Sequence, residues 1–226
     1  MTISVRQGFA SADRDLVVEL YWQAFGDKLG LVLRPQACAL AFIGAVVRAD
    51  HSFCAYDARG QLLGVAGFKS PDGAFVGGDL GALARVYGWG GAIWRAGLLT
   101  LLGRDMENRR FLLDGLVVRP EARSQGVGSA LLQAITEEAA RRGYSEVRLD
   151  VIDTNQRARA LYEREGFRPL KTQRLGLLSW IFGFSAATTM VRAVGGTPGD
   201  DGNKPVLALH KRPGHPPDQQ ERPGGA

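Results

Sequence analysis

The chain has 226 residues, of which 45% are hydrophobic and 23% are charged, and its formal net charge at pH 7 is +5. This length allows one domain with a full hydrophobic core, and the composition is that of an ordinary globular protein. The positive charge would suit a polyphosphate ligand, but the basic residues are scattered, so the sequence predicts no nucleic-acid partner.

The cysteine and histidine content narrows the functional classes further. Cys38 and Cys54 do not form a metal spacing such as CxxC, so we expect free thiols in a reducing compartment, the cytoplasm. Only His51 lies outside the C-terminal tail, and its distance from the motifs below predicts a surface loop. The sequence therefore disfavours metal-dependent and Ser-His-Asp hydrolases, and we expect no metal. Met1–Phe9 lacks the basic and apolar regions of a signal peptide.

The first half of the chain predicts alternating strands and helices. Apolar residues at helical spacing follow Ser11 and Asp13, either of which could cap the helix. The turn Asp57–Gly60 predicts a hairpin between two strands, and residues 70–73 are expected to form a loop. The expected elements are a strand at Ile3–Arg6, a helix to about Phe25, a helix from Pro35 to about Val47, strands at Ser52–Tyr56 and Gln61–Lys69, and one or two helices over Leu80–Gly103.

The second half predicts the order strand, helix, strand, helix, strand. Glycines end both helices, and Asn155 can cap the second one. The expected elements are a strand at Phe111–Val118, a helix at Gly126–Arg142, a strand at Ser145–Ile152, a helix at Asn155–Glu165, and strands at Phe167–Leu170 and Ala187–Arg192. We expect one domain over residues 1–194. Residues 195–226 are rich in proline and glycine and have no aromatic residue, which predicts a disordered tail.

A glycine-containing loop joins the strand ending at Val118 to the next helix. Its sequence is RSQGVG at residues 123–128. A helix N-terminus has unpaired backbone N–H groups and partial positive charge, and glycines let a phosphate approach them. The spacing fits neither a P-loop, GxxxxGK[ST], nor the dinucleotide fingerprint GxGxxG. By itself the loop is equally compatible with a tight turn before a helix.

A second motif makes the interpretation more specific. Residues 155–162 are NQRARALY, and Gly166-Phe167 follows. Together with the loop, this region of about 60 residues resembles the GNAT N-acetyltransferase superfamily, which shows R/Q-x-x-G-x-G/A and later N-x-x-A-x-x-x-Y before G-F. The resemblance implies an α/β (α+β) GNAT fold, in which helices flank a mixed, mostly antiparallel sheet with a splayed central pair of strands.

The resemblance also implies an acetyl-CoA site between the splayed strands. Gly115 could allow a bulge that opens the sheet. On helical geometry Asn155 and Tyr162 share one face, and the small Ala158 between them leaves room for a thin ligand. The plain alternative for Asn155 is a helix cap. The implied contacts are the strand backbone at Leu116, Val117 and Val118 for the pantetheine arm, and the backbone of Arg123, Ser124, Gln125, Gly126, Val127 and Gly128 for the pyrophosphate, with Ser129 nearby.

Acetyl transfer needs an acid for the leaving thiolate and a base for the amine proton. Within the resemblance Tyr162 is the acid candidate, although a core aromatic residue is the alternative. Asp150 lies twelve residues earlier, similar to the glutamate of ribosomal-protein N-terminal acetyltransferases, and is the first candidate for the base. Asp114 on the neighbouring strand is the rival. Either carboxylate could instead face solvent or pair with Arg148 or Arg110.

Two apolar blocks, Leu80–Leu102 and Leu175–Phe184, have no counterpart in these motifs. Arg85 and Arg95 interrupt the first and the second is short, so we expect no transmembrane segment. They could form core, an acceptor-pocket wall, a homodimer contact or a surface-lying helix, and we favour the pocket wall. The expected acceptor is a small, partly apolar amine. A peptide N-terminus, or a non-catalytic CoA-binding regulator, are the alternatives.

Overall fold

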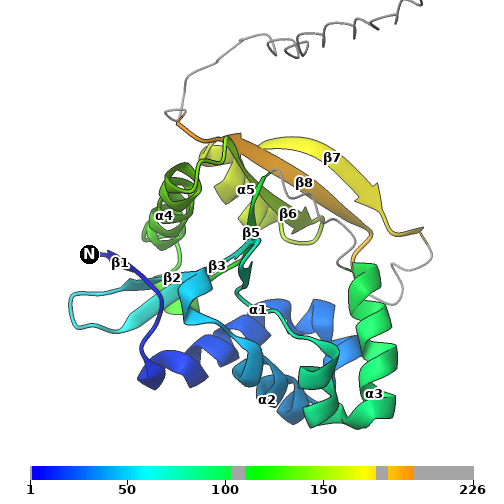
Figure 1. The fold of residues 1–226 in the computed structure, drawn as a ribbon. Helices are drawn as coiled ribbons and strands as arrows, with labels where there is room; N and C mark the ends of the chain where they lie inside the picture. The colour runs from blue at the N-terminus through cyan, green and yellow to red at the C-terminus, as the bar shows by residue number, and fades with distance from the viewer. Residues whose placement is uncertain (1, 103–109, 177–182, 196–226) are drawn as a thin grey trace, which may run out of the picture.

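The computed structural model describes residues 2–102, 110–176 and 183–195. Almost all of the predicted disordered tail, and most of the second apolar block, therefore lie outside the described residues. The described chain folds as one mostly antiparallel sheet with helices on both faces (Figure 1). This arrangement confirms the predicted fold class.

The sheet has the strand order β1-β2-β3-β5-β6-β8-β7, and the short β4 pairs with β3. Only β5 and β6 are parallel neighbours; the other pairs are antiparallel. The strands are β1 Ser4–Gln7, β2 Ser52–Tyr56, β3 Leu62–Ser70, β4 Gly73–Ala74, β5 Phe111–Val118, β6 Glu146–Ile152, β7 Arg168–Arg174 and β8 Ala186–Ala193.

Two hydrophobic cores lie on opposite faces of the sheet. Val65 and Val117 belong to the first core, and their chain neighbours Ala66 and Val118 belong to or pack against the second. Neighbouring strand residues point to opposite faces, so the cores are separated by the sheet. α1 Arg14–Leu33, α2 Gln36–Val46 and α3 Leu80–Leu102 cover the first core, and α4 Val127–Arg141 and α5 Gln156–Arg164 cover the second (Figure 1).

The structure confirms the predicted elements and corrects some of their ends. α1 runs to Leu33 rather than Phe25, because Val32 and Leu33 bury their side chains in the first core. Neither predicted cap residue caps it; the Asp13 carboxylate instead accepts a hydrogen bond of 3.0 Å from the Tyr56 hydroxyl. α3 consists of two helical pieces joined at Gly88, whose φ of 69° breaks the helix. β7 is longer than predicted and ends at Arg174.

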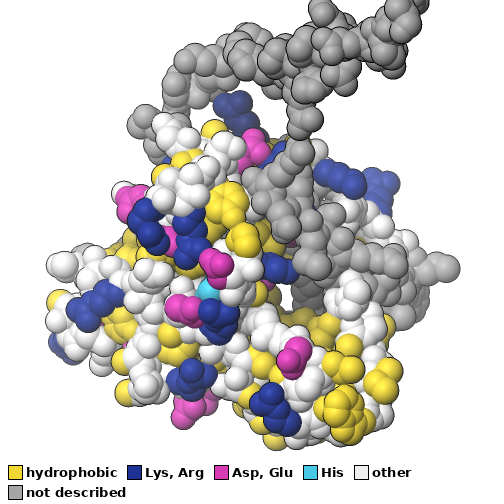
Figure 2. Space-filling view, viewed as in Figure 1, with side chains coloured by type: hydrophobic (Ala, Val, Ile, Leu, Met, Phe, Trp, Pro, Cys, Tyr) yellow, Lys and Arg dark blue, Asp and Glu magenta, His cyan; other side chains and the backbone are white. Residues whose placement is uncertain are grey.

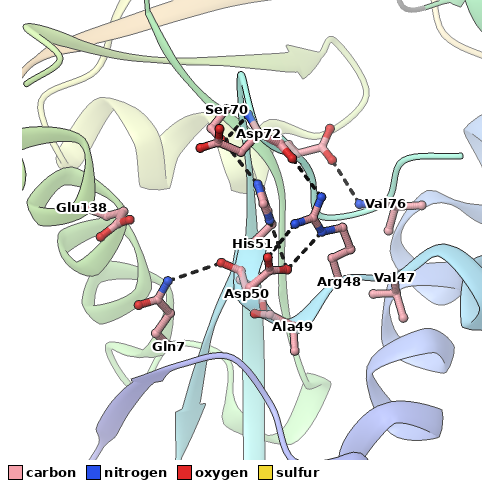
Figure 3. Close-up of polar contacts among 12 residues, drawn as sticks. Gln7, Val47, Arg48, Ala49, Asp50, His51, Ser70, Asp72, Val76 and Glu138 are labelled. Atoms are coloured by element: carbon pink, nitrogen blue, oxygen red, sulfur yellow. Dashed lines mark hydrogen bonds and ion pairs between the residues drawn. The ribbon is translucent and has the colours of Figure 1, made fainter. Parts of the chain in front are cut away.

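The prediction that His51 lies in a surface loop is wrong. The side chain is only 3% exposed, and its ring lies 5.2 Å from the ring of Phe68. His51 belongs to the 3-10 turn Ala49–His51, and β3 passes beside this turn, which brings the Ser70 hydroxyl to 3.2 Å from Nε2 (Figure 3). Position along the sequence gave no sign of this packing, because the contacts are made across a hairpin.

A polar cluster surrounds His51 and fastens this corner of the sheet. Asp50 lies 3.1 Å from His51 Nδ1 and pairs with Arg48, which keeps the pKa of the Asp50 carboxyl well below its usual range (Figure 3). Arg48 also donates to the carbonyl oxygen of Asp72, at 2.9 Å. The cluster therefore holds the β3–β4 turn against the segment that follows α2.

The described residues were also searched for membrane spans and metal sites. No helix among them combines the length and the apolar character needed to cross a bilayer. Within the same ranges, no group of three or more His, Cys, Asp and Glu side chains could hold a metal ion.

Candidate functional site

The central strands β5 and β6 diverge after a short stretch of pairing. They pair only at Phe111↔Val147 and Leu112↔Arg148. Beyond these pairs, β5 continues to pair with β3 and β6 with β8, on their outer sides. The facing edges of the two strands are therefore bonded to no other described strand. This opening is the splayed pair that the sequence predicts.

A bulge in β5 lies at the mouth of the opening. Gly115 is opposite Gly67 and Leu113 is opposite Phe68, so Asp114 is the extra residue of the bulge. The predicted bulge is confirmed. A Cβ atom at Gly115 would lie 2.8 Å from the Phe25 ring, so only glycine allows α1 to pack so closely here. An extra strand residue bends the strand and increases its twist, which turns β5 away from β6.

Two residues of the loop that precedes α4 have a positive φ. Ser124 has a φ of 62° and Gly126 a φ of 86°, and Gly126 occupies the N-cap position without any side-chain cap. The N–H groups of the first turn of α4 have no partners within the helix. Unlike those N–H groups, the N–H of Arg123 already donates to the Pro120 carbonyl, and its Nε donates to the Val118 carbonyl.

Side chains of this loop contact α5. Arg157 Nη2 donates to the Ser124 hydroxyl at 2.9 Å, and the Ser129 hydroxyl donates to a Glu165 carboxylate oxygen at 2.5 Å. A Cβ atom at Gly128 would lie 2.8 Å from a Leu161 methyl carbon, so this glycine allows the two helices to approach closely. These contacts fix α5 beside the start of α4.

The remaining loop residues make local contacts. The Gln125 side chain donates to the carbonyl of Glu121 at 2.7 Å, and the Val127 side chain is buried in the second core. Gln125 and Val127 therefore offer a ligand their backbone groups rather than their side chains.

Asn155 caps α5, as the sequence predicts. Its Oδ1 accepts a hydrogen bond of 3.1 Å from the Ala158 N–H, and its side chain is exposed. The helix places Ala158 one turn further along, and Tyr162 follows near its end. The three residues predicted to share a face are therefore held on one short, well-capped helix.

Tyr162 is the buried residue of α5. Its side chain is 7% exposed in the second core, with its ring 5.9 Å from that of Phe167. Burial raises the pKa of Tyr162 to about 12, so the phenol keeps its proton at neutral pH. Within the described ranges its hydroxyl has no hydrogen-bond partner.

Asp114 and Asp150 flank the opening from its two sides. Each lies two residues beyond the last paired residue of its strand, Leu112 or Arg148. Leu113 and Leu149 point into the second core, so both aspartates lie on the opposite face. The register therefore places both carboxylates that the sequence predicts on one face of the sheet, on either side of the opening.

The two carboxylates have different surroundings. Asp150 accepts a hydrogen bond of 2.6 Å from the Thr189 hydroxyl and lies 3.5 Å from Arg148 Nη2, with 41% of its side chain exposed. The Asp114 carboxylate accepts a long hydrogen bond of 3.5 Å from the Val76 N–H. Burial, with a smaller effect from the charge of Asp114, raises the pKa of Tyr21 well above its usual range.

Aromatic rings from outside the predicted motifs lie over the bulge. Tyr21 and Phe25 of α1 have ring centroids 4.6 Å apart, and Phe75 lies 5.8 Å from Tyr21. A Cβ atom at Gly67 would lie within 2.5 Å of three Phe75 atoms, so Gly67 makes room for this ring. The sequence analysis did not single out Tyr21, which lies close enough to Asp114 to feel its charge; its spacing of four residues from Phe25 was the available signal.

The first apolar block divides between two environments. One side of α3 packs on α1 and α2 in the first core, while Trp89, Ile93 and Trp94 are exposed. Of the second block, Leu175, Gly176, Gly183 and Phe184 are described, and Phe184 is buried. The interpretation of these blocks as an acceptor-pocket wall stays a prediction.

Comparison with known proteins gives a family match and partial relatives. The model of the acetyltransferase (GNAT) family matches residues 15–167. The chain is 39% identical over 64 residues to the thialysine N-epsilon-acetyltransferase of Bos taurus, a match that covers 28% of this chain and 38% of that protein. A relative from Mus musculus with the same name is 34% identical over 86 residues, or 38% of this chain and 50% of that protein. The chain thus spans half or less of the length of these curated relatives.

Solved structures share the fold at low identity. The structure described as SsHAT matches with a TM-score of 0.62 and 19% identity, covering 87% of this chain and all of the other. An N-acetyltransferase from Staphylococcus aureus Mu50 matches with a TM-score of 0.57 and 15% identity, covering 84% and 100%. At such identities the likeness supports the fold alone.

Proposed function

Because the chain belongs to the acetyltransferase (GNAT) family, we propose that it is an N-acetyltransferase that moves an acetyl group from acetyl-CoA to a primary amine. The observation that carries this proposal is the opening between β5 and β6, which leads toward a helix N-terminus with a left-handed glycine. An extended arm with a pyrophosphate at one end has the shape and charge that such a site would bind.

We assign the pantetheine arm to β5 and the pyrophosphate to the loop. Leu116, Val117 and Val118 pair with β3 on one side only, so their remaining backbone groups, apart from the Val118 carbonyl that accepts from Arg123, are placed to bond an amide-bearing arm. Backbone N–H groups from Ser124 to Gly128 would meet the pyrophosphate. Arg123 contributes less, since its N–H and Nε are already donating within the turn.

In the reaction the neutral amine attacks the thioester carbonyl, the new C–N bond forms and the C–S bond breaks. We propose that the Tyr162 hydroxyl donates to the departing sulfur. A phenol with a pKa of about 12 is a weaker acid than a thiol, whose ordinary pKa is about 8.5. Tyr162 would therefore stabilise the developing thiolate mainly by hydrogen bonding, and the amine proton leaves to a base.

Asp150 is our first candidate for that base, directly or through a water molecule. The Thr189 hydroxyl fixes its carboxylate at the opening, and the side chain keeps enough exposure to meet an acceptor. Asp114 remains the second candidate, because it follows the last β5–β6 pair on the other strand.

The proposed acceptor is a small, partly apolar primary amine. Asp114 can attract an ammonium group, and the rings of Tyr21, Phe25 and Phe75 beside it favour an apolar chain. The name of the bovine relative, a thialysine N-epsilon-acetyltransferase, also points to a side-chain amine. Acetylation of protein N-termini is the alternative within the family.

The test is thiol release from acetyl-CoA with a panel of small amines and peptides, in which mass spectrometry identifies the product. We expect turnover with at least one amine and an added acetyl mass on it. Binding of acetyl-CoA without turnover on any acceptor would instead favour a CoA-binding regulator. Two free cysteines, Cys38 and Cys54, support a reducing compartment, and we propose the cytoplasm as the place of action.

A further inference from the structure

An apolar surface on the second piece of α3 is unused by the proposed site. Trp89 is 67% exposed, Ile93 63% and Trp94 46%, whereas Ala92 of the same helix is fully buried. Figure 2 shows hydrophobic side chains gathered over this helix, at the lower right. Proteins rarely expose two tryptophans and an isoleucine together without a partner for them.

The three side chains form one continuous face. Trp89 and Ile93 are four residues apart, so they lie one above the other, and Trp94 adjoins them. Gly90 and Gly97 are exposed on the same helix and add no polar side chain. A Cβ atom would meet nothing within 4 Å at either glycine, so this side is open.

All the charged side chains of this helix are positive. Leu80–Leu102 contains Arg85 and Arg95 and no acidic residue. The Arg95 guanidinium lies 4.0 Å from the ring centre of Tyr87 and 4.3 Å from that of Trp94, so a cation is held at the edge of the apolar face. The nearby Asp79 carboxylate is engaged, because it caps the start of α3 through the Ala82 N–H at 2.7 Å.

We propose that this face of α3, defined by Trp89, Ile93 and Trp94, docks the protein on an anionic phospholipid surface. Tryptophan rings favour the boundary between lipid headgroups and acyl chains, and arginine favours lipid phosphate. A second copy of the chain fits less well, since two such faces would bring arginines together without a carboxylate from either α3. The proposed docking is to the membrane surface and requires no spanning segment.

The experiment measures co-sedimentation of the full chain with phosphatidylcholine vesicles, with and without phosphatidylglycerol. We expect binding that requires phosphatidylglycerol, with a blue shift of tryptophan emission. Trp89→Ser with Ile93→Ser should weaken binding about tenfold or more. Arg85→Glu should weaken it by at least about fivefold. Leu170→Ser is the matched control, because Leu170 is 53% exposed on β7, and it should bind as the wild type does.

This test is independent of the proposed acetyl transfer, because it measures vesicle binding and not enzymatic turnover. Unchanged melting temperatures would show that the variants fold, and Trp89→Ser alone provides a milder second test. Absence of vesicle binding, or equal binding by the double variant, overturns the proposal. If light scattering finds a dimer that the double substitution dissociates, while vesicles are not bound, the face belongs to a second copy.

Discussion

Replacing Gly126 by glutamate tests whether the loop before α4 holds a pyrophosphate. A Cβ atom at Gly126 would meet nothing within 4 Å, so the folded protein suffers no clash. The φ of 86° costs a residue other than glycine about 1–2 kcal/mol, which lowers stability without closing the site. A carboxylate about 4 Å from a phosphate charge adds a repulsion of roughly 1 kcal/mol in water and about 4 kcal/mol near a protein surface. Acetyl-CoA affinity should therefore fall by roughly five- to a thousandfold.

Two further variants separate charge from backbone strain. Gly126→Ala carries the strain and the Cβ atom without the charge, so it should lose less affinity. Gly143→Glu is the matched control, since Gly143 has a φ of 77° and open space at the other end of the same helix. It should lower the melting temperature to a similar degree and leave affinity unchanged. Calorimetry gives the dissociation constants. A folded Gly126→Glu protein that binds acetyl-CoA as tightly as the wild type would refute the pyrophosphate assignment.

Three other substitutions test the chemistry and the packing. Tyr162→Phe should lower kcat by about 10²-fold while acetyl-CoA affinity stays similar, and wild-type turnover would return Tyr162 to a core role. Asp150→Asn should lower kcat/KM most at pH values below the pKa of the acceptor amine, and the variant should recover part of its activity as the pH rises. If Asp114→Asn shows this pH dependence instead, the base is Asp114. Gly67→Ala should lower the free energy of unfolding by about 2 kcal/mol or more, because its methyl group would clash with the Phe75 ring. Denaturant unfolding measures this loss, and unchanged stability would contradict the packing.

Local signals in the sequence predicted the strands, the helices and the glycine-containing turn before α4. β5 and β2 have the predicted ends, and Asn155 caps α5 as predicted. These features depend on residues near in sequence: an apolar run, a cap, or a glycine that ends a helix. The continuation of α1 beyond Phe25 was missed, because it depends on burial against other helices rather than on its own pattern.

Features that depend on register between strands could not be predicted. The alignment of Gly67 with Gly115 and the placing of Asp114 in the bulge follow from how β3 pairs with β5. That both carboxylates share one face of the opening follows from the pairing of β5 with β6. Burial of His51 has the same origin, since its partners come from a returning strand. The sequence indicated the candidate residues, and only the pairing showed which of them meet.

The opening between β5 and β6 is maintained by the packing around it. Gly67 and Gly115 lie opposite each other, and the rings of Phe75 and Phe25 fill the space that side chains would take. These rings and Tyr21 belong to or pack against the first core, while Leu113 and Leu149 anchor the same strands in the second. Closing the gap would require both cores to repack. The edge of β5 beyond Leu112 therefore pairs with no described strand on the β6 side, and binding of an extended arm there would not have to break strand pairing first.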